Sequence, residues 1–211
     1  FKCDWSSDVC SSDLPTHITL TPEVEQFRKE FERLAREADA LVAPLSDEEF
    51  NRVPPSGGWP VAKCIDHLNA TAREYLPQLD DAIAEAIRQG LYGSGPFRYN
   101  IIGRLFVQMM EPPVKRIKAK APAMFLPADN RSRQEIMAAF RAYQVQLVDR
   151  LRQANGLDLA RARVLSPVST WLRIPLGSGF GVIAAHERRH LWQARQVIQD
   201  RKITRLNSSH T

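Results

Sequence analysis

Four long stretches of this chain carry apolar side chains at alternating steps of three and four residues, the spacing of one face of an α-helix. No stretch alternates apolar and polar residues as a half-buried strand would, and no segment repeats another. A helix with one apolar side must cover that side against a partner, so the pattern predicts an all-α four-helix bundle with long connecting loops. The four stretches cover about residues 21–45, 60–89, 132–154 and 179–199.

Local signals mark where some of these helices begin or break. Thr21 can cap the first helix, and Pro22 suits the first helical position, where no amide hydrogen is needed. Ser132 followed by Glu135 forms a capping box that opens the third helix. Pro77 lies inside the second stretch and is expected to kink or split that helix, because proline removes a backbone hydrogen bond.

The two ends of the chain do not continue this pattern. Residues 4–14 read DWSSDVCSSDL, and the opposite strand of a DNA that encodes this run encodes DRKSTRLNSS. Residues 200–209 read DRKITRLNSS, which differs from it at one position. A natural gene has no reason to encode one DNA segment on both strands, so both ends resemble translated sequencing-adapter read-through. We therefore expect non-native tails at residues 1–14 and 200–211 around one native domain, residues 15–199.

Composition narrows the classes of protein that remain. With 211 residues, 44% hydrophobic and 25% charged, the chain has the composition of a globular domain. Of its three cysteines only Cys64 lies in the native span, which fits a reducing cytoplasm. The apolar run 100–110 is too short for a membrane span of about 20 residues. The net charge is only +5, and the basic run 114–120 has no interleaved aromatic residues, so we expect no nucleic-acid partner. We expect no membrane partner either.

Three histidines fall on the apolar faces of two predicted helices. His67 follows the inward face of the second helix, and His186 and His190 lie one turn apart on one face of the last. A single histidine on such a face is most often a hydrogen-bonded core residue. Three buried imidazoles without partners would cost about 1–3 kcal/mol each, and a divalent metal ion removes that cost. The pattern therefore predicts one Zn, Ni or Fe ion held by these three residues, with a position open for water or substrate.

Five further residues are candidates for the same site. Cys64, Thr71 and Tyr75 share the inward face of the second helix with His67, although Cys64 has a simpler interpretation as a small core residue. Gln193 is expected to line the site or to hydrogen-bond a histidine. Glu187 is the candidate general base. It lies about 100° around the helix from His186, so a solvated or salt-bridged side chain is the simpler interpretation.

Residues 186–190 read HERRH, a match to the HExxH motif of zinc peptidases. The extended form of that motif needs glycine and histidine where this chain has Gln193 and Gln196. No sheet is predicted that could hold an extended peptide. The third ligand must then come from upstream, where His67 is the candidate, and a peptidase is the least favoured alternative.

Two segments resemble one known family. Residues 57–68, GGWPVAKCIDHL, are similar to the second-helix segment of the DinB/YfiT-like superfamily, where a tryptophan precedes the helix and a His-Leu pair supplies the first metal ligand. Residues 186–199, HERRHLWQARQVIQ, are similar to its last helix, with HxxxH followed by a glutamine. The resemblance spans about residues 20–199. It implies a four-helix bundle, often dimeric, whose divalent ion is held by His67, His186 and His190.

The resemblance also implies classes of activity. Members with known activities include thiol S-transferases that act with low-molecular-weight thiols, a mycothiol-dependent isomerase and hydrolases. We therefore expect a bacterial, cytoplasmic and dimeric metal-dependent enzyme that activates water or a thiol for hydrolysis or S-transfer on a small molecule. The alternative from a different class is a non-catalytic bundle that binds a ligand or partner in the same cavity.

Overall fold

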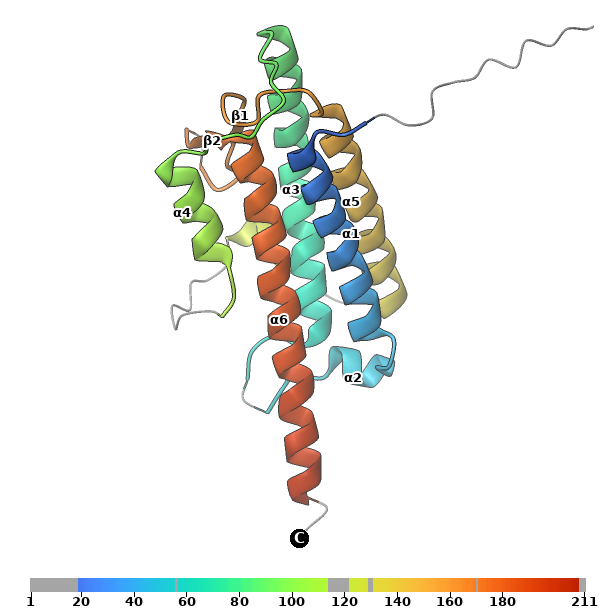
Figure 1. Cartoon of the computed structure of the whole chain (residues 1–211). Helices are drawn as coiled ribbons and strands as arrows, with labels where there is room; N and C mark the ends of the chain where they lie inside the picture. Colours follow the sequence, from blue (N-terminus) through green and yellow to red (C-terminus); the bar gives the residue numbers. More distant parts are fainter. Residues whose placement is uncertain (1–18, 56, 114–121, 129–130, 170, 209–211) are drawn as a thin grey trace, which may run out of the picture.

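Four long helices lie side by side and form the body of the protein (Figure 1). The computed structural model describes residues 19–208 except 56, 114–121, 129–130 and 170, and of residues 201–208 only the backbone. The first and second long helices each pack against both the third and the fourth. The prediction of an all-α four-helix bundle is therefore confirmed. The long helices are α1 (Pro22–Val42), α3 (Val61–Arg88), α5 (Arg133–Gln153) and α6 (Leu176–Ser208).

Short elements occupy the connections between these helices. The two strands pair antiparallel, with Val164 opposite Ile174. The sequence predicts no strand here, because three residues are too few for an alternating pattern to appear. The short elements are α2 (Asp47–Asn51), α4 (Ile101–Met110), the 3₁₀ turn η1 (Ala123–Phe125), β1 (Arg163–Leu165) and β2 (Arg173–Pro175).

The predicted start of α5 is confirmed in atomic detail, whereas that of α1 is confirmed only in position. Ser132 Oγ accepts from the Glu135 amide at 3.2 Å, and Glu135 Oε2 accepts from the Ser132 amide at 2.8 Å. Thr21 precedes α1 as expected, but its side chain makes no capping bond. Its amide instead donates to Asn155 Oδ1 at 2.8 Å, which ties the start of α1 to the end of α5.

Pro77 does not split α3, which runs unbroken from Val61 to Arg88. The proline removes one backbone hydrogen bond, a loss that tertiary packing can offset. Its neighbours Leu76 and Leu79 are buried in the bundle, so burial of the apolar face holds the helix together across the missing bond.

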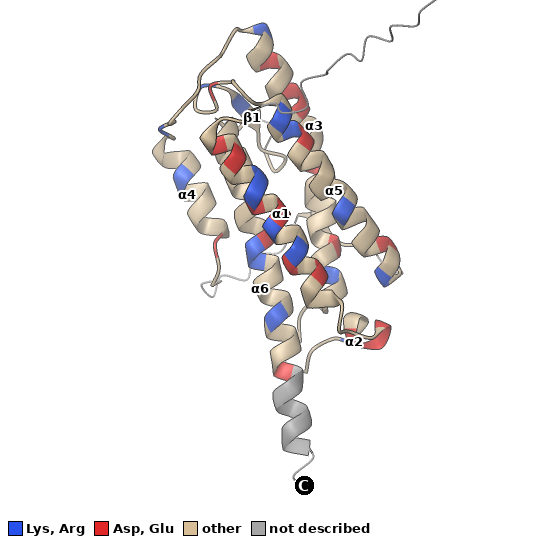
Figure 2. Ribbon diagram, turned by 45° about the vertical axis from the view of Figure 1, so that its right-hand side comes forward, with Lys and Arg blue, Asp and Glu red and all other residues tan. Residues whose placement is uncertain are grey.

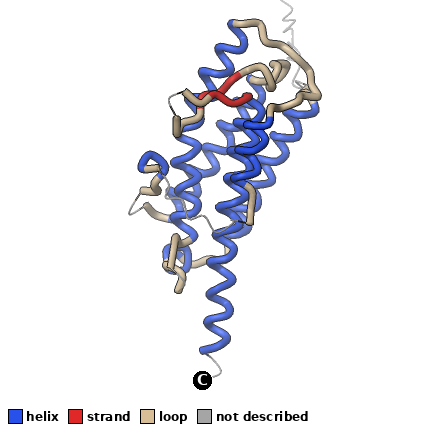
Figure 3. Tube along the Cα trace, turned by 90° about the vertical axis from the view of Figure 1, so that its left-hand side faces the viewer, coloured by secondary structure: helices blue, strands red, loops and turns tan. Residues whose placement is uncertain are grey.

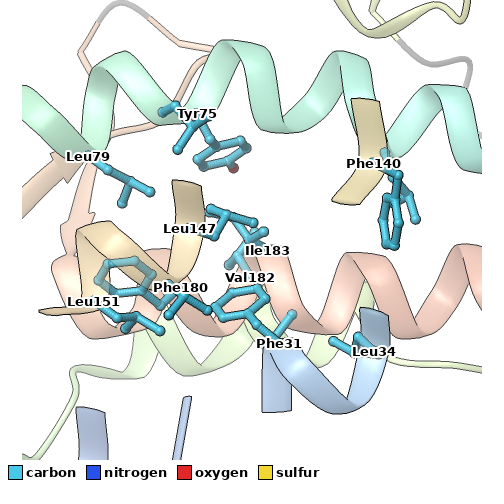
Figure 4. Packing of buried hydrophobic residues seen from close by; sticks show 14 of the residues in the cluster. Phe31, Leu34, Tyr75, Leu79, Phe140, Leu147, Leu151, Phe180, Val182 and Ile183 are labelled. Carbon is cyan, nitrogen blue, oxygen red and sulfur yellow. The ribbon is translucent and has the colours of Figure 1, made fainter. Parts of the chain in front are cut away.

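The bundle interior is filled by apolar side chains from all four long helices (Figure 4). Phe31 of α1, Leu79 of α3, Phe140 of α5 and Phe180 of α6 are at most 1% exposed. Phe31, Leu79 and Phe140 lie on the apolar faces that the spacing predicted for their helices. Ile87, which continues the stripe of α3, is 49% exposed.

The helix α4 lies outside the four-helix core and packs along α6 (Figure 1). Its inner face makes a close approach at Gly103, where a Cβ would lie 2.3 Å from Ser178 Oγ. Its outer face leaves Ile101 83% exposed. Among the described residues, no helix combines the length and the apolar character that crossing a membrane requires.

The last helix is longer than expected. It begins at Leu176, directly after β2, and continues to Ser208, so that its end extends beyond the other helices (Figure 3). No glycine or proline after Gln199 interrupts the helical backbone.

Acidic and basic side chains are interspersed along α1 (Figure 2), where Arg33 pairs with Glu30 at 2.8 Å. Arg188 of α6 also pairs with Glu30, at 2.5 Å, so this network links α1 to α6.

Candidate metal centre

The three predicted histidines meet where α3 packs against α6. Nε2 of His186 lies 3.2 Å from Nε2 of His67 and 3.0 Å from Nε2 of His190. His186 and His190 project from one face of α6 because they are one turn apart, and the packing of α3 brings His67 to them. One nitrogen from each ring lies within 4.8 Å of the other two.

His67 is held in one orientation by a backbone carbonyl. Its Nδ1 lies 2.6 Å from the carbonyl oxygen of Phe125 in η1. A carbonyl can only accept, so Nδ1 carries the hydrogen, and Nε2 of the neutral ring presents a lone pair to the other two histidines. Phe125 was not predicted from the sequence, because a residue 58 positions away that acts through its backbone leaves no pattern there.

The two close contacts between imidazole nitrogens cannot both be hydrogen bonds. Nε2 of His186 takes part in both, and a neutral imidazole nitrogen carries either one hydrogen or one lone pair. A hydrogen there could serve His67 but not His190 as well. A lone pair there could accept from His190 but would face the lone pair of His67. A cation between three lone pairs satisfies all three atoms.

The surroundings keep the cluster neutral. Burial is the largest cause that lowers the pKa of each of the three histidines, and it brings the pKa of His186 to about 3. The positive charge of Arg189, which lies next to His190 in the chain, lowers all three pKa values further. Neutral imidazole is the form that binds metal ions, so the site favours the competent state.

The donor set fits a divalent ion. Nitrogens bound to tetrahedral zinc at 2.0–2.1 Å stand about 3.3 Å apart, which is close to the contacts of 3.0 and 3.2 Å found here. Within the described ranges, no thiol or carboxylate joins this group of ligand atoms. Three neutral nitrogens suit Zn²⁺, Ni²⁺ or Fe²⁺ and would leave at least one coordination position of the ion without a protein ligand.

Aromatic rings pack against the histidine cluster. Trp59, just before α3, stacks on His190 with ring centroids 6.1 Å apart and meets His67 edge-on at 5.0 Å. The ring of Phe125 meets His67 edge-on at 6.4 Å. These contacts restrict rotation of the imidazoles and exclude water from the faces they cover. Trp59 is the tryptophan of the motif that precedes the second helix.

The candidates on α3 have different surroundings. Thr71 Oγ1 donates to the backbone carbonyl of His67 at 2.9 Å, so it braces the turn that carries the histidine. Cys64 is buried as a free thiol whose pKa burial raises to about 12. Tyr75 lies two turns beyond His67, and its hydroxyl bonds Ser166 beside β1. The structure therefore brings Thr71 to His67 and directs the Tyr75 hydroxyl elsewhere.

Glu187 faces the interior of the bundle. It is 3% exposed, its Oε1 accepts from Gln144 Nε2 of α5 at 2.7 Å, and burial raises its pKa to about 8. The expectation of a solvated or salt-bridged side chain is wrong, because the turn of the helix between His186 and Glu187 carries the carboxyl toward α5. This placement does not favour the peptidase alternative, since the glutamate of HExxH acts on water at the metal. Gln144, its partner, carried no signal in the sequence.

Gln193 lies one turn after His190 and interacts with that ring. The interaction raises the pKa of His190 against the larger effect of burial. Nδ1 of His190 is buried, and among the residues with described side chains none forms a hydrogen bond of good geometry with it. A role for Gln193 in orienting His190 stays a prediction.

The chain is similar to one known family over most of its length. The DinB superfamily matches residues 30–194, a span that contains Trp59 and all three histidines. No curated protein and no solved structure matches the chain. The match covers most of the sequence, including the α3 and α6 segments that build the histidine cluster. The chain therefore belongs to the DinB superfamily.

Proposed function

We propose that this protein binds one divalent metal ion through His67, His186 and His190 and is a metal-dependent enzyme acting on a small molecule. The observation that carries the proposal is the convergence of three Nε2 atoms that cannot satisfy one another by hydrogen bonding. When bound, the ion would supply Lewis acidity, which lowers the pKa of water or of a thiol toward neutrality.

The chain's own residues hold and shape this site. The Phe125 carbonyl orients His67, and Trp59 restricts the rings of His67 and His190. Three protein ligands leave at least one coordination position for a nucleophile or substrate. Water as the nucleophile fits hydrolysis, and a low-molecular-weight thiol as co-substrate fits S-transfer. We further propose a bacterial, cytoplasmic homodimer with neither a nucleic-acid nor a membrane partner.

The charge balance of the site favours an anionic substrate. Three neutral imidazoles leave the two charges of a divalent ion uncompensated, and no carboxylate among the described residues belongs to the cluster. Arg189 adds a third positive charge nearby. Because uncompensated charge attracts its opposite most strongly where water is excluded, a substrate with a carboxylate or thiolate suits this site better than a neutral one.

Elemental analysis of the full chain tests the metal site. The protein is purified without a His tag under metal-replete conditions, beside His67→Ala and His190→Ala. We expect one divalent ion per chain, lost in both variants. His17→Ala serves as a matched control, since it removes a histidine outside the proposed ligand set. An ion-free wild type with both variants folded would contradict the proposal.

One observation favours a second candidate, a non-catalytic bundle that binds a ligand at the same site. Within the described ranges the cluster contains no carboxylate, and Glu187 bonds Gln144 in the interior instead. Turnover separates the two candidates. The metal-loaded protein is assayed with esters, amides and thiol acceptors, each in a neutral and an anionic form. Turnover that His67→Ala abolishes supports the enzyme, and metal binding without turnover supports the binding protein.

A further inference from the structure

A buried carboxylate, Asp66, lies next to His67 on α3 and bonds the connection between η1 and α5. It is 3% exposed. Its Oδ1 accepts from the Arg131 guanidinium at 2.6 Å and from Asn69 Nδ2 at 3.2 Å. Its Oδ2 accepts from the Ala128 amide at 2.8 Å. A charged acceptor with several donors is a strong and directional anchor, so Asp66 holds this connection at two points.

The same face of α3 also bonds the elements on either side of this connection, η1 and α5. Arg73 donates to the Met124 carbonyl at 3.2 Å, and Asn69 donates to the Ile136 carbonyl at 3.0 Å. Residues 66, 69 and 73 follow one another at steps of three and four, which places them on one side of the helix. The Phe125 carbonyl that bonds His67 lies within the segment that these side chains hold.

We infer that Asp66 is a positioning residue for the metal site. By holding Ala128 and Arg131, it keeps the Phe125 carbonyl on Nδ1 of His67, and Nε2 then stays free of hydrogen and available to the ion. The inference rests on the proposed function, because it concerns the same three histidines. Asp66 itself is not among the ligand atoms that gather at the cluster.

This role requires both acceptor oxygens of the Asp66 carboxylate. Asparagine has the same shape but offers only one acceptor oxygen, and its amide group would face either the Ala128 amide or the Arg131 guanidinium, both of which are donors. One of the two holding points would therefore be lost without leaving a cavity. The Phe125 carbonyl would then be free to leave His67, and the imidazole hydrogen could move to Nε2.

Asp66→Asn in the full chain tests this inference with two measurements. The first is ¹⁵N NMR of the histidine rings in the metal-free protein at about pH 8, where imidazoles are neutral. In the wild type we expect His67 to carry its hydrogen on Nδ1. In the variant we expect a mixture of the two neutral tautomers, one with the hydrogen on Nδ1 and the other with it on Nε2. The loss of signals in His67→Gln assigns the resonances. The second is a competition titration with Zn²⁺, in which we expect the affinity to fall about 10–100-fold.

Asp80→Asn is the matched control. Asp80 also lies on α3 and pairs with an arginine of α5, Arg150, at 2.8 and 2.9 Å. This variant should keep both the tautomer of His67 and the affinity for Zn²⁺. A merely structural Asp66 would change stability in its variant and leave the tautomer unchanged.

Each outcome decides the inference. A folded Asp66→Asn protein with wild-type tautomer and wild-type affinity would overturn it. If that variant does not fold, Ala128→Pro removes the amide donor from an exposed loop residue, and the same two measurements decide. A wild type that binds no Zn²⁺ would refute the proposed function, whereas the tautomer of His67 in the metal-free variant would still confirm or refute the role of Asp66.

Discussion

Glu187 and Gln144 face each other in the interior and share one hydrogen bond. Glu187→Gln keeps the shape, and two amides can pair through both of their donor and acceptor atoms. We expect the free energy of unfolding in urea to stay within about 1 kcal/mol of the wild type and the metal content to be retained. Glu187→Leu leaves the Gln144 amide without an acceptor and should lose about 1–3 kcal/mol.

Turnover by the same variant tests the peptidase alternative. If Glu187→Gln stays folded and metal-loaded but loses all activity, the carboxyl acts on the substrate or on water. The position of Glu187 in the interior would then describe a resting arrangement only.

Cys64 lies one turn before His67, but burial raises the pKa of its thiol to about 12. Because the thiolate is the reactive form, we expect Cys64 to resist an aromatic disulfide reagent at about pH 8 in the folded protein. The assay uses a Cys3→Ser, Cys10→Ser background. One thiol per chain should react with the reagent in urea, and none should react in native buffer. Fast reaction in native buffer would instead indicate an accessible, activated thiol near the histidines.

The same pKa shift has a consequence for stability. The unfolded thiol ionises at about pH 8.5, whereas the folded thiol stays protonated until about pH 12. The contribution of Cys64 to stability is therefore complete below about pH 8.5 and is lost as the pH rises toward 12. Cys64→Ala in the same background should reduce the alkaline decline measured by urea denaturation.

At the scale of the helices, the capping box of α5 should contribute measurably to the free energy of unfolding. Ser132→Ala removes the oxygen that accepts from the Glu135 amide, and we expect a loss of about 0.5–2 kcal/mol in the free energy of unfolding. Thr21→Ala is the matched control, because Thr21 stands at the same position before α1 but its side chain makes no capping bond. Equal losses in the two variants would contradict this assignment.

The helices also show which local signals tertiary packing overrides. Pro77 should interrupt α3, but buried neighbours on both sides of it keep the helix continuous. Ile87 belongs to the apolar stripe and is nevertheless exposed. A stripe predicts which side of a helix faces inward, but only the lengths and positions of the neighbouring helices decide where along its length that side is covered.

At the scale of the whole molecule, the proposed ion links two helices that are distant in the chain. His67 lies on α3 and His186 on α6, so an ion bound to both should stabilise the folded state but not the unfolded state. Zn²⁺ at 100 times its dissociation constant should add about 2.7 kcal/mol, seen as a higher Tm that EDTA reverses. His190→Ala should show a much smaller shift. An equal shift in this variant would place the ion elsewhere.

Local spacing was enough to predict the four helices and part of the site. The apolar stripes predicted the bundle, and the step of four residues between His186 and His190 placed both rings on one face of α6. His67 was proposed as the third ligand because it shares an inward face, but no spacing relates it to a residue 119 positions later. The contact itself depends on how α3 packs against α6.

The sequence by itself determined the helices, the inward position of the three histidines and the family, because these depend on periodicity and on residue identity within short windows. Only the tertiary structure decided that the Phe125 carbonyl orients His67, that Asp66 holds that segment in place, and that Glu187 turns toward Gln144. These contacts join segments more than 40 positions apart, and two of them use backbone atoms that every residue possesses. Such contacts arise from the packing of whole helices, so a pattern of neighbouring side chains cannot reveal them.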